Sequence, residues 1–148
     1  MEIIRRDSDY GIRALLYLAR VGKALVPCAQ VAAACGIPKS FAYKILRKLV
    51  GAGVVASQVG RPGGFTLRKK PERISLATII ETMQGPISVV KCVVDSSMCR
   101  SAETCVFAGK LRELHEQIVR FLKQTTLKDL LAPSKRPKRA KRGRSRAR

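Results

Sequence analysis

A glycine-rich stretch between two short apolar runs is the feature that most constrains how this chain folds. Residues 54–58 and 65–68 each have the length and composition of a short strand, and the stretch between them reads Gly60-Arg61-Pro62-Gly63-Gly64. Such a pattern is typical of a β-hairpin. The cation at its tip, Arg61, can enter a minor groove of DNA, where narrow A·T segments concentrate negative potential. A solvated loop cation is the alternative.

Two short helices are predicted directly before this hairpin. The first helix begins at Pro27. Its apolar residues recur at the spacing that places them on one face of a helix: Cys28, Val31, Ala32 and Cys35. We expect these two cysteines to be small core residues. Gly36-Ile37-Pro38 forms a tight turn into the second helix, where a proline is acceptable in the first turn.

The second of these helices combines an apolar stripe with a polar, basic outer face that includes Lys48. The stripe predicted to be buried consists of Phe41, Ile45, Leu46 and Leu49. Two helices of this kind joined by a glycine-containing turn are typical of a helix-turn-helix, although two ordinary helices with a solvated face are the alternative. The hairpin that follows favours a winged helix-turn-helix. The residues predicted to contact DNA are Lys39, Ser40, Tyr43, Lys44, Arg47, Arg61 and Gly63.

Helices are also predicted on both sides of this unit. A first helix covers about Ser8 to Arg20, and Asp7, Ser8 and Asp9 offer capping oxygens at its start. After the hairpin, Ser75 caps a helix that ends at Gly85. The prediction is a mostly α fold with a small β-hairpin, in which residues 1–85 form the winged helix-turn-helix domain.

A long helix is predicted after Cys105. Its apolar residues step by four and three positions, which is expected of a dimerisation helix and also suits packing on the N-terminal domain: Phe107, Leu111, Leu114, Ile118 and Phe121. Leu127, Leu130 and Leu131 indicate a short last helix or turn. Residues 86–131 are therefore predicted to form a second unit, a cysteine loop with a dimerisation helix.

The chain is strongly basic, with 30 Lys and Arg against 10 Asp and Glu and a formal net charge of +20. Nine of the sixteen residues from Pro133 to Arg148 are Lys or Arg, and none is acidic. Residues 132–148 are therefore predicted to form a disordered basic tail. A charge of this sign indicates a polyanionic partner, for which double-stranded DNA is the expectation.

Three of the five cysteines, Cys92, Cys99 and Cys105, fall in a segment without helical or strand periodicity. A loop can fold three thiols onto one centre, which makes a site for a soft metal or an iron–sulfur cluster. Unrelated surface thiols, or a disulfide with one cysteine left over, are the alternatives. The only histidine, His115, lies ten residues past Cys105, about 15 Å along a helix, and is expected to be a helix-flank side chain.

The compartment follows from what the sequence lacks. No apolar run approaches the ~18 residues that span a membrane, and the N-terminus does not have the pattern of a signal peptide. An odd number of cysteines without a regular framework favours a reducing cytoplasm, where the protein would associate with the nucleoid. No nucleophile–base pair or phosphate loop supports an enzyme.

The order of these parts resembles the Rrf2 family of bacterial winged helix-turn-helix regulators, including its IscR-like and NsrR-like iron–sulfur members. The resemblance covers roughly residues 1–131. It rests on the run from Ser8 to Leu15, the wing from Gly60 to Phe65 and the cysteine triplet. It implies a homodimer that binds a pseudo-palindromic operator and carries a cluster on the three cysteines and one further ligand.

Two departures from the family pattern bear on the cluster, one in its further ligand and one in the cysteine spacing. IscR-like members have a histidine three residues after the last cysteine, where this chain has Ala108. NsrR-like members use an aspartate near the N-terminus of the partner subunit, and Asp9 stands at the matching position. A helix cap is the alternative role for Asp9, and Asp95 and Glu103 are competing ligands. The first cysteine spacing is one residue longer than in both groups, so the resemblance leaves 2Fe–2S and 4Fe–4S clusters open.

The function predicted from the sequence is a transcriptional regulator whose operator binding is switched by an iron–sulfur cluster. The signal would be redox state, nitric oxide, or iron and cluster status. Three alternatives remain open: a cluster-free thiol redox regulator of the same fold, a regulator with structural zinc in the same loop, and a non-specific basic nucleic-acid-binding protein.

Overall fold

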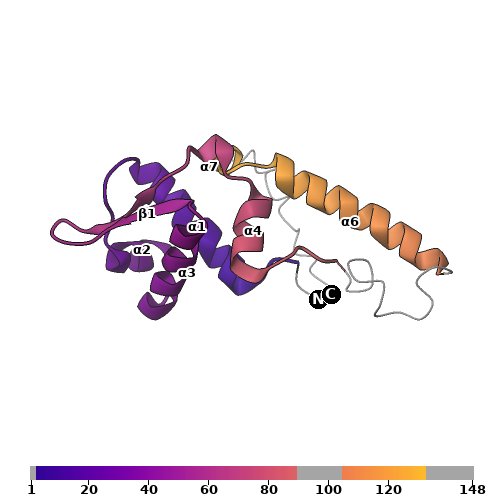
Figure 1. Ribbon diagram of the computed structural model, residues 1–148, viewed down its shortest axis with the longest axis horizontal. Helices are drawn as coiled ribbons and strands as arrows, with labels where there is room; N and C mark the ends of the chain where they lie inside the picture. The colour runs from indigo at the N-terminus through magenta and orange to yellow at the C-terminus, as the bar shows by residue number, and fades with distance from the viewer. Residues whose placement is uncertain (1–2, 90–104, 133–148) are drawn as a thin grey trace, which may run out of the picture.

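The computed structural model describes residues 3–89 and 105–132. Figure 1 shows an N-terminal body of packed helices with a projecting hairpin. One long helix extends from this body on the side away from the hairpin. The predicted fold class is confirmed, because the chain is mostly helical with one antiparallel hairpin. The elements are α1 (Arg6–Val21), α2 (Cys28–Cys35), α3 (Lys39–Gly51), β1 (Val55–Gln58), β2 (Gly64–Leu67), the 3-10 turn η1 (Pro71–Arg73), α4 (Leu76–Gln84), α6 (Val106–Gln124) and α7 (Leu127–Leu131).

The first helix begins earlier than predicted, at Arg6. Asp7 and Asp9 therefore lie inside its first turn, where the helix dipole favours negative charge, and no side chain caps the helix. Ser8 is fully buried, and its hydroxyl donates a 2.7 Å hydrogen bond to Oε1 of Gln84. The predicted capping role of Asp7, Ser8 and Asp9 is thus wrong. Ser8 instead joins the start of α1 to the end of α4.

Helices α1 and α4 cross at a glycine. A Cβ atom on Gly11 would lie 3.1 Å from Cγ and 3.3 Å from Sδ of Met83. It would also meet Cγ2 of Ile79 at 3.6 Å. The absent side chain lets the two helices approach closely, which fixes α4 relative to α1.

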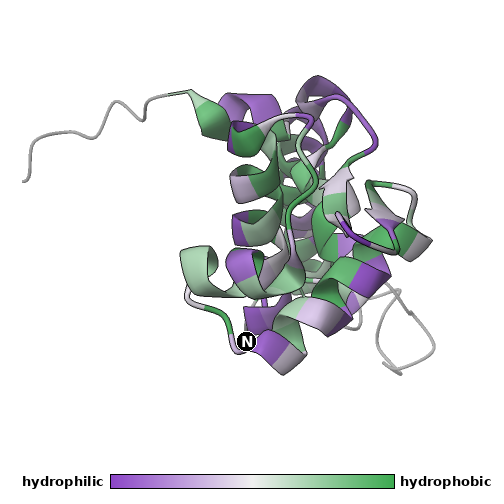
Figure 2. Ribbon diagram, turned by 90° about the vertical axis from the view of Figure 1, so that its left-hand side faces the viewer, coloured by the Kyte–Doolittle hydropathy of each residue, from purple (hydrophilic) through white to green (hydrophobic). Residues whose placement is uncertain are grey.

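The core is built from the inner faces of the helices in the N-terminal body and from the hairpin. Figure 2 shows hydrophobic residues mostly between the helices and hydrophilic residues mostly on their outer sides. Ser75 caps α4 as predicted, since its Oγ accepts a hydrogen bond from the backbone N–H of Thr78. The largest fully buried side chains are Leu15, Leu18, Leu46, Leu49, Ile74, Ile79, Ile80 and Leu127.

The buried stripe of α3 differs from the prediction at one position. Phe41 is 43% exposed, whereas Ala42 is only 1% exposed. Ala42 forms a small buried cluster with Ala32 and Ile37, at the point where α2 turns into α3. A small side chain fits this close contact between the two helices, so Phe41 is turned outward and its predicted burial is wrong.

The wing is a two-stranded antiparallel hairpin, in register from Val55 opposite Leu67 to Gln58 opposite Gly64. Val26, just before α2, extends this pairing, because Val26 and Phe65 exchange two backbone hydrogen bonds of 2.9 Å. A Cβ atom on Gly64 would lie 2.7 Å from the backbone carbon and oxygen of Val26. A glycine is therefore required at this position for the wing to attach to the domain.

The C-terminal helices return to the N-terminal body. The backbone N–H of Leu127, which is fully buried, donates a 2.8 Å hydrogen bond to the carbonyl of Ile74. Thr126 and Asp129 form a capping box that starts α7. Within α6 only Leu122, near its C-terminal end, is buried. The helix is thus attached at that end, and the rest of it projects from the body (Figure 1).

Candidate nucleic-acid interface and cysteine site

The outer face of α3 carries the residues predicted from this helix to contact DNA, and all of them are exposed: Lys39, Ser40, Tyr43, Lys44 and Arg47. The opposite face packs into the core through Ile45, Leu46 and Leu49. An exposed basic helix of this size can enter a major groove, with its N-terminal residues nearest the base edges.

Lys48 is exposed on α3, as predicted, but its ammonium group is bound by a neighbouring helix. Its Nζ donates a 2.9 Å hydrogen bond to the backbone oxygen of Met83 in the last turn of α4. A cation is favourable at the end of a helix, where carbonyl groups lack helical partners. Lys48 therefore joins α3 to α4, and the sequence offered no signal that distinguished it from its basic neighbours.

Aromatic and cationic side chains connect the start of α1 to α3. The rings of Tyr10 and Phe41 meet edge to face, with centroids 6.4 Å apart. Arg13 lies over the Tyr10 ring at 6.0 Å, and Nζ of Lys44 lies over the Phe41 ring at 5.8 Å. These contacts order the exposed N-terminal half of α3 against α1. The sequence pattern does not indicate these contacts, because the spacing of Phe41 predicts that it lies in the core.

At the wing tip, Arg61 is exposed and Gly63 is half-buried. A Cβ atom on Gly63 would lie 2.5 Å from the carbonyl oxygen of Gly60, so the hairpin itself requires this glycine. Any DNA contact by Gly63 would have to come from its backbone. Next to these residues, Val59 is 97% exposed.

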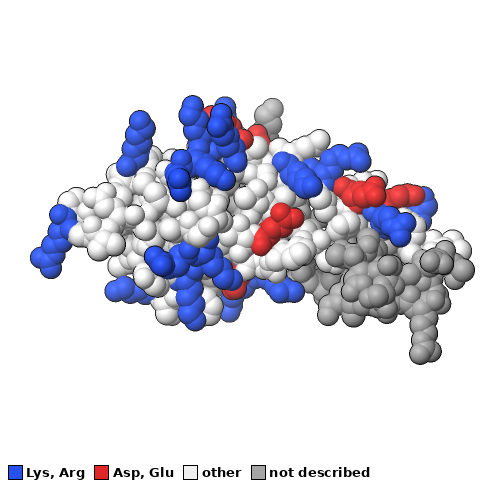
Figure 3. All heavy atoms as spheres, viewed as in Figure 1, with Lys and Arg blue, Asp and Glu red and all other residues white. Residues whose placement is uncertain are grey.

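Positive charge is spread over the N-terminal body. Figure 3 shows Lys and Arg side chains around the helices and at the end of the wing, with few acidic side chains on the same face. Such a surface attracts a polyanion over a wide range of approach.

Asp9, the predicted cluster ligand, is held by Arg13 one helical turn later. Nη2 of Arg13 lies 2.7 Å from Oδ2 of Asp9, and its Nε donates a 3.2 Å hydrogen bond to Oδ1. The Asp9 side chain is 46% exposed and the Arg13 side chain is 51% exposed. A pair this exposed contributes little to stability, so the Asp9 carboxylate is accessible.

The two cysteines of α2 are half-buried free thiols that pack against the core. Burial raises the pKa of Cys28 and of Cys35, against a smaller opposite effect of Lys39 and of Arg13, respectively. Sγ of Cys35 also contacts the backbone oxygen of Arg13 at 3.5 Å. A thiol that stays protonated is a poor metal ligand and nucleophile, which agrees with the prediction that both are packing residues.

Of the three cysteines predicted as ligands, the structure describes Cys105, a half-buried free thiol at the N-cap of α6. Cys92 and Cys99 lie outside the described residues, as do the competing carboxylates Asp95 and Glu103. Within residues 3–89 and 105–132, no three His, Cys, Asp or Glu side chains gather into a metal site. The N-terminus of a helix favours negative charge, so the position of Cys105 suits a thiolate-bound group.

The long helix α6 presents an apolar stripe that the described residues leave largely uncovered. Phe107, Leu114 and Phe121 are 67%, 45% and 63% exposed, while Leu111 and Ile118 are half-buried. The stripe begins two residues after Cys105. These side chains follow the predicted seam, and an exposed stripe of this length is expected to contact another polypeptide.

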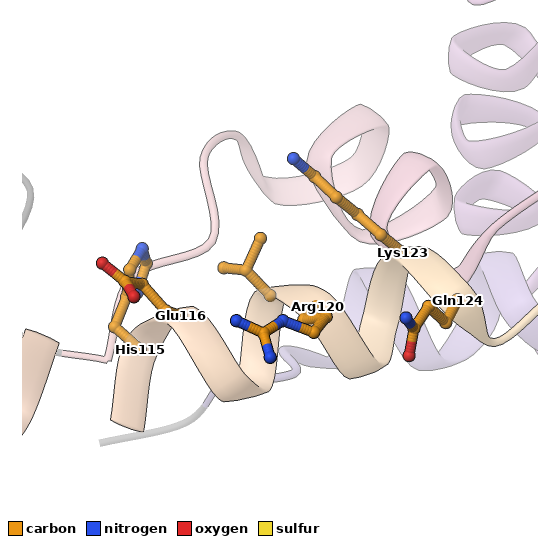
Figure 4. A pocket seen from close by; sticks show the side chains of 6 residues that line it. His115, Glu116, Arg120, Lys123 and Gln124 are labelled. Carbon is orange, nitrogen blue, oxygen red and sulfur yellow. The ribbon is translucent and has the colours of Figure 1, made fainter. Parts of the chain in front are cut away.

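A groove of about 520 Å³ follows another side of α6. Figure 4 shows the polar side chains that line it, and Nδ1 of His115 is buried without a hydrogen-bond partner among the described residues. The sequence does not indicate this groove, because the residues that line it have the pattern of a solvated helix surface. They are His115, Glu116, Val119, Arg120, Lys123 and Gln124. No helix in the described ranges has the length and hydrophobicity to cross a membrane.

The fold, the exposed basic helix and the wing define a DNA-binding winged helix-turn-helix protein. A model of the Rrf2 family, described as iron-dependent transcriptional regulators, matches residues 4–133. The chain belongs to this family and is a transcriptional regulator, not an enzyme.

Individual relatives agree with this assignment. NsrR regulators of Halalkalibacterium halodurans and Streptomyces coelicolor are 33% and 32% identical to the chain. The match with the first relative covers 84% of this chain and 86% of that relative. The match with the second covers 87% of this chain and 88% of that relative. Among solved structures, CymR, the global cysteine regulator of B. subtilis, superimposes with a TM-score of 0.72 at 25% identity, over 88% of this chain and 97% of CymR.

Proposed function

We propose that the chain is a homodimeric regulator whose operator binding is switched by an iron–sulfur cluster. Cys92, Cys99 and Cys105 would hold the cluster, and Asp9 of the partner subunit would complete the site. The observation that carries this proposal is the placement of Cys105, at the start of a long helix whose apolar stripe is exposed. The cysteine segment therefore leads directly into a surface suited to subunit contact.

The dimer would form through the apolar stripe of α6. Three of its large side chains, Phe107, Leu114 and Phe121, are exposed in the single chain, and their burial in a helix pair would provide the driving force. Residues 86–131 would then be the cysteine and dimerisation unit, residues 1–85 the DNA-binding unit and residues 132–148 a basic tail.

A ligand from the partner subunit fits the arrangement better than one from the same chain. In Figure 1 the start of α6 lies at the end of the helix farthest from the N-terminal body, whereas Asp9 is in the first turn of α1. The Asp9 carboxylate is half-exposed, and among the described residues its partner is Arg13, in an exposed ion pair. Exchange of that pair for a cluster iron would cost little.

Ligation of Asp9 would have a physical route to the recognition helix. Arg13 would be released when Asp9 binds the cluster, and Arg13 lies over Tyr10. Tyr10 packs against Phe41, whose ring is in turn contacted by Lys44 on the DNA-facing side of α3. When bound, a cluster supplies iron that responds to nitric oxide, oxygen or iron supply. The protein side chains would convert its presence into a change at Lys44.

DNA would be read by two copies of α3 on half-sites about one helical turn apart in a pseudo-palindromic operator. Lys39, Ser40, Tyr43, Lys44 and Arg47 would contact base edges or phosphates in the major groove. Arg61, with the backbone of Gly63, would contact the adjacent minor groove. The protein would act in the cytoplasm, associated with the nucleoid.

Anaerobic purification with iron and sulfide analysis tests the cluster, and operator affinity before and after cluster loss tests the switch. We expect a coloured protein whose operator affinity changes when the cluster is removed. A colourless protein whose affinity follows thiol oxidation would favour a cluster-free regulator, an alternative kept open by the similarity to CymR. Zinc without redox response, or binding without sequence preference, would favour the other two alternatives.

The variant Asp9→Ala tests the fourth ligand. It should assemble a cluster that is more labile and should uncouple cluster loss from the change in DNA affinity. Asp7→Ala is the matched control, because Asp7 lies in the same helical turn. Normal cluster lifetime and normal switching in Asp9→Ala would remove Asp9 from the site, and Glu103 would be the next residue to test.

A further inference from the structure

Phe41 is an aromatic side chain exposed on the helix that we assign to DNA recognition. It is the third residue of α3, and 43% of it is accessible. Ala42 occupies the core position next to it. The Phe41 ring is therefore not a core side chain that happens to be partly accessible. It lies beside the cation of Lys44, on the part of the helix that enters the groove first.

The Phe41 ring is held in a defined position. Tyr10 contacts it from α1 with an interplanar angle of 73°, and Nζ of Lys44 lies over the ring at 5.8 Å. Lys44 is one helical turn from Phe41, so the two side chains project on the same side of α3. α3 thus presents an apolar ring and a cation together. This combination suits the base edges of the major groove, whereas a purely electrostatic contact with phosphates would need only the cation.

The major groove offers one apolar group, the 5-methyl group of thymine. The phosphates alone would be satisfied by Lys39, Lys44 and Arg47 and would gain nothing from an exposed ring. We infer that Phe41 reads a thymine 5-methyl group in each half-site of the operator. This inference rests on the proposed role of α3 as the recognition helix, and it adds a base contact by a residue that the sequence pattern placed in the core.

The test begins with the full-length protein and an operator selected from random duplexes. Each thymine is then replaced by deoxyuridine, which removes only the methyl group. At one thymine of each half-site we expect the replacement to weaken binding about fourfold, the effect of one buried carbon group. Phe41→Ala should bind the thymine and uracil operators equally well. Tyr43→Ala, which removes the other exposed aromatic ring of α3, should retain the preference for thymine.

A second measurement uses the unaltered protein and does not depend on the folding of a variant. The methyl-sensitive thymine is replaced by 5-iododeoxyuridine, whose iodine occupies the methyl position, and the complex is irradiated. Mass spectrometry should identify Phe41 as the crosslinked residue. The inference is overturned if no thymine is methyl-sensitive, if Phe41→Ala keeps the sensitivity, or if the crosslink is on another residue. Failure to select any operator would instead count against sequence-specific binding itself.

Discussion

Lys48 of the recognition helix donates a 2.9 Å hydrogen bond to the backbone oxygen of Met83, at the end of α4. The bond fixes α3 against the helix that precedes the cysteine segment. Lys48→Met keeps the aliphatic stem and removes the charged donor, so we expect the free energy of unfolding in urea to fall by about 1–2 kcal/mol. Lys44→Met is the control and should lower DNA affinity with little effect on stability. Equal losses of stability in the two variants would contradict this role of Lys48.

Replacement by alanine is expected to have opposite effects on the free energy of unfolding at Gly11 and at Gly109. A Cβ atom on Gly11 would lie 3.1 Å from Cγ of Met83, whereas one on Gly109 would meet nothing within 4 Å. Gly11→Ala should lower the free energy of unfolding by about 1–3 kcal/mol, since the tight helix contact must open. Gly109→Ala should raise it by about 0.5–1 kcal/mol, because alanine favours the helix interior. Thermal or urea denaturation of both variants, followed by circular dichroism, measures the difference.

Arg61 is expected to contact the minor groove from the wing tip. Arg61→Ala should weaken operator binding by about 1–3 kcal/mol if the contact is made. Arg68→Ala is the matched control, because it removes the same charge just after β2, away from the tip. Fluorescence anisotropy with the selected operator measures both, and an unchanged affinity for Arg61→Ala would refute the contact.

The cysteines should separate into two groups by their effect on the cluster. Replacement of Cys92, Cys99 or Cys105 by Ala should abolish the visible absorbance of the anaerobically purified protein. Cys28→Ala and Cys35→Ala should keep it, because these thiols pack against the core and burial raises the pKa of each. Full cluster occupancy in any of the first three variants would remove that residue from the ligand set.

The basic tail should add affinity for DNA without adding specificity. Its nine cations can displace condensed counterions, and each phosphate contact contributes about 0.9 to the slope of log affinity against log salt. Deletion of residues 133–148 should flatten this slope and weaken binding to operator and random duplexes alike. A loss confined to the operator would show that the tail reads sequence.

Sequence reasoning succeeded where a local pattern has one physical interpretation. The spacing of Ile45, Leu46 and Leu49 can bury only one side of a helix, and these residues are buried. The glycines of the wing predicted a hairpin because few other residues allow such a tip. The cysteine ligands and the DNA contacts remain predictions, since they depend on a bound group, a partner subunit or a duplex.

What the sequence determined by itself was the order and type of the elements, together with the charge that directs the protein to DNA. These follow from periodicity, turn residues and composition, which act over a few positions. Only the tertiary structure decided that Ala42 enters the core in place of Phe41, that Lys48 binds the end of α4, and that Ser8 hydrogen-bonds to Gln84 instead of capping α1. Each of these outcomes depends on how closely two helices approach, and that distance is set by side chains far apart in the chain.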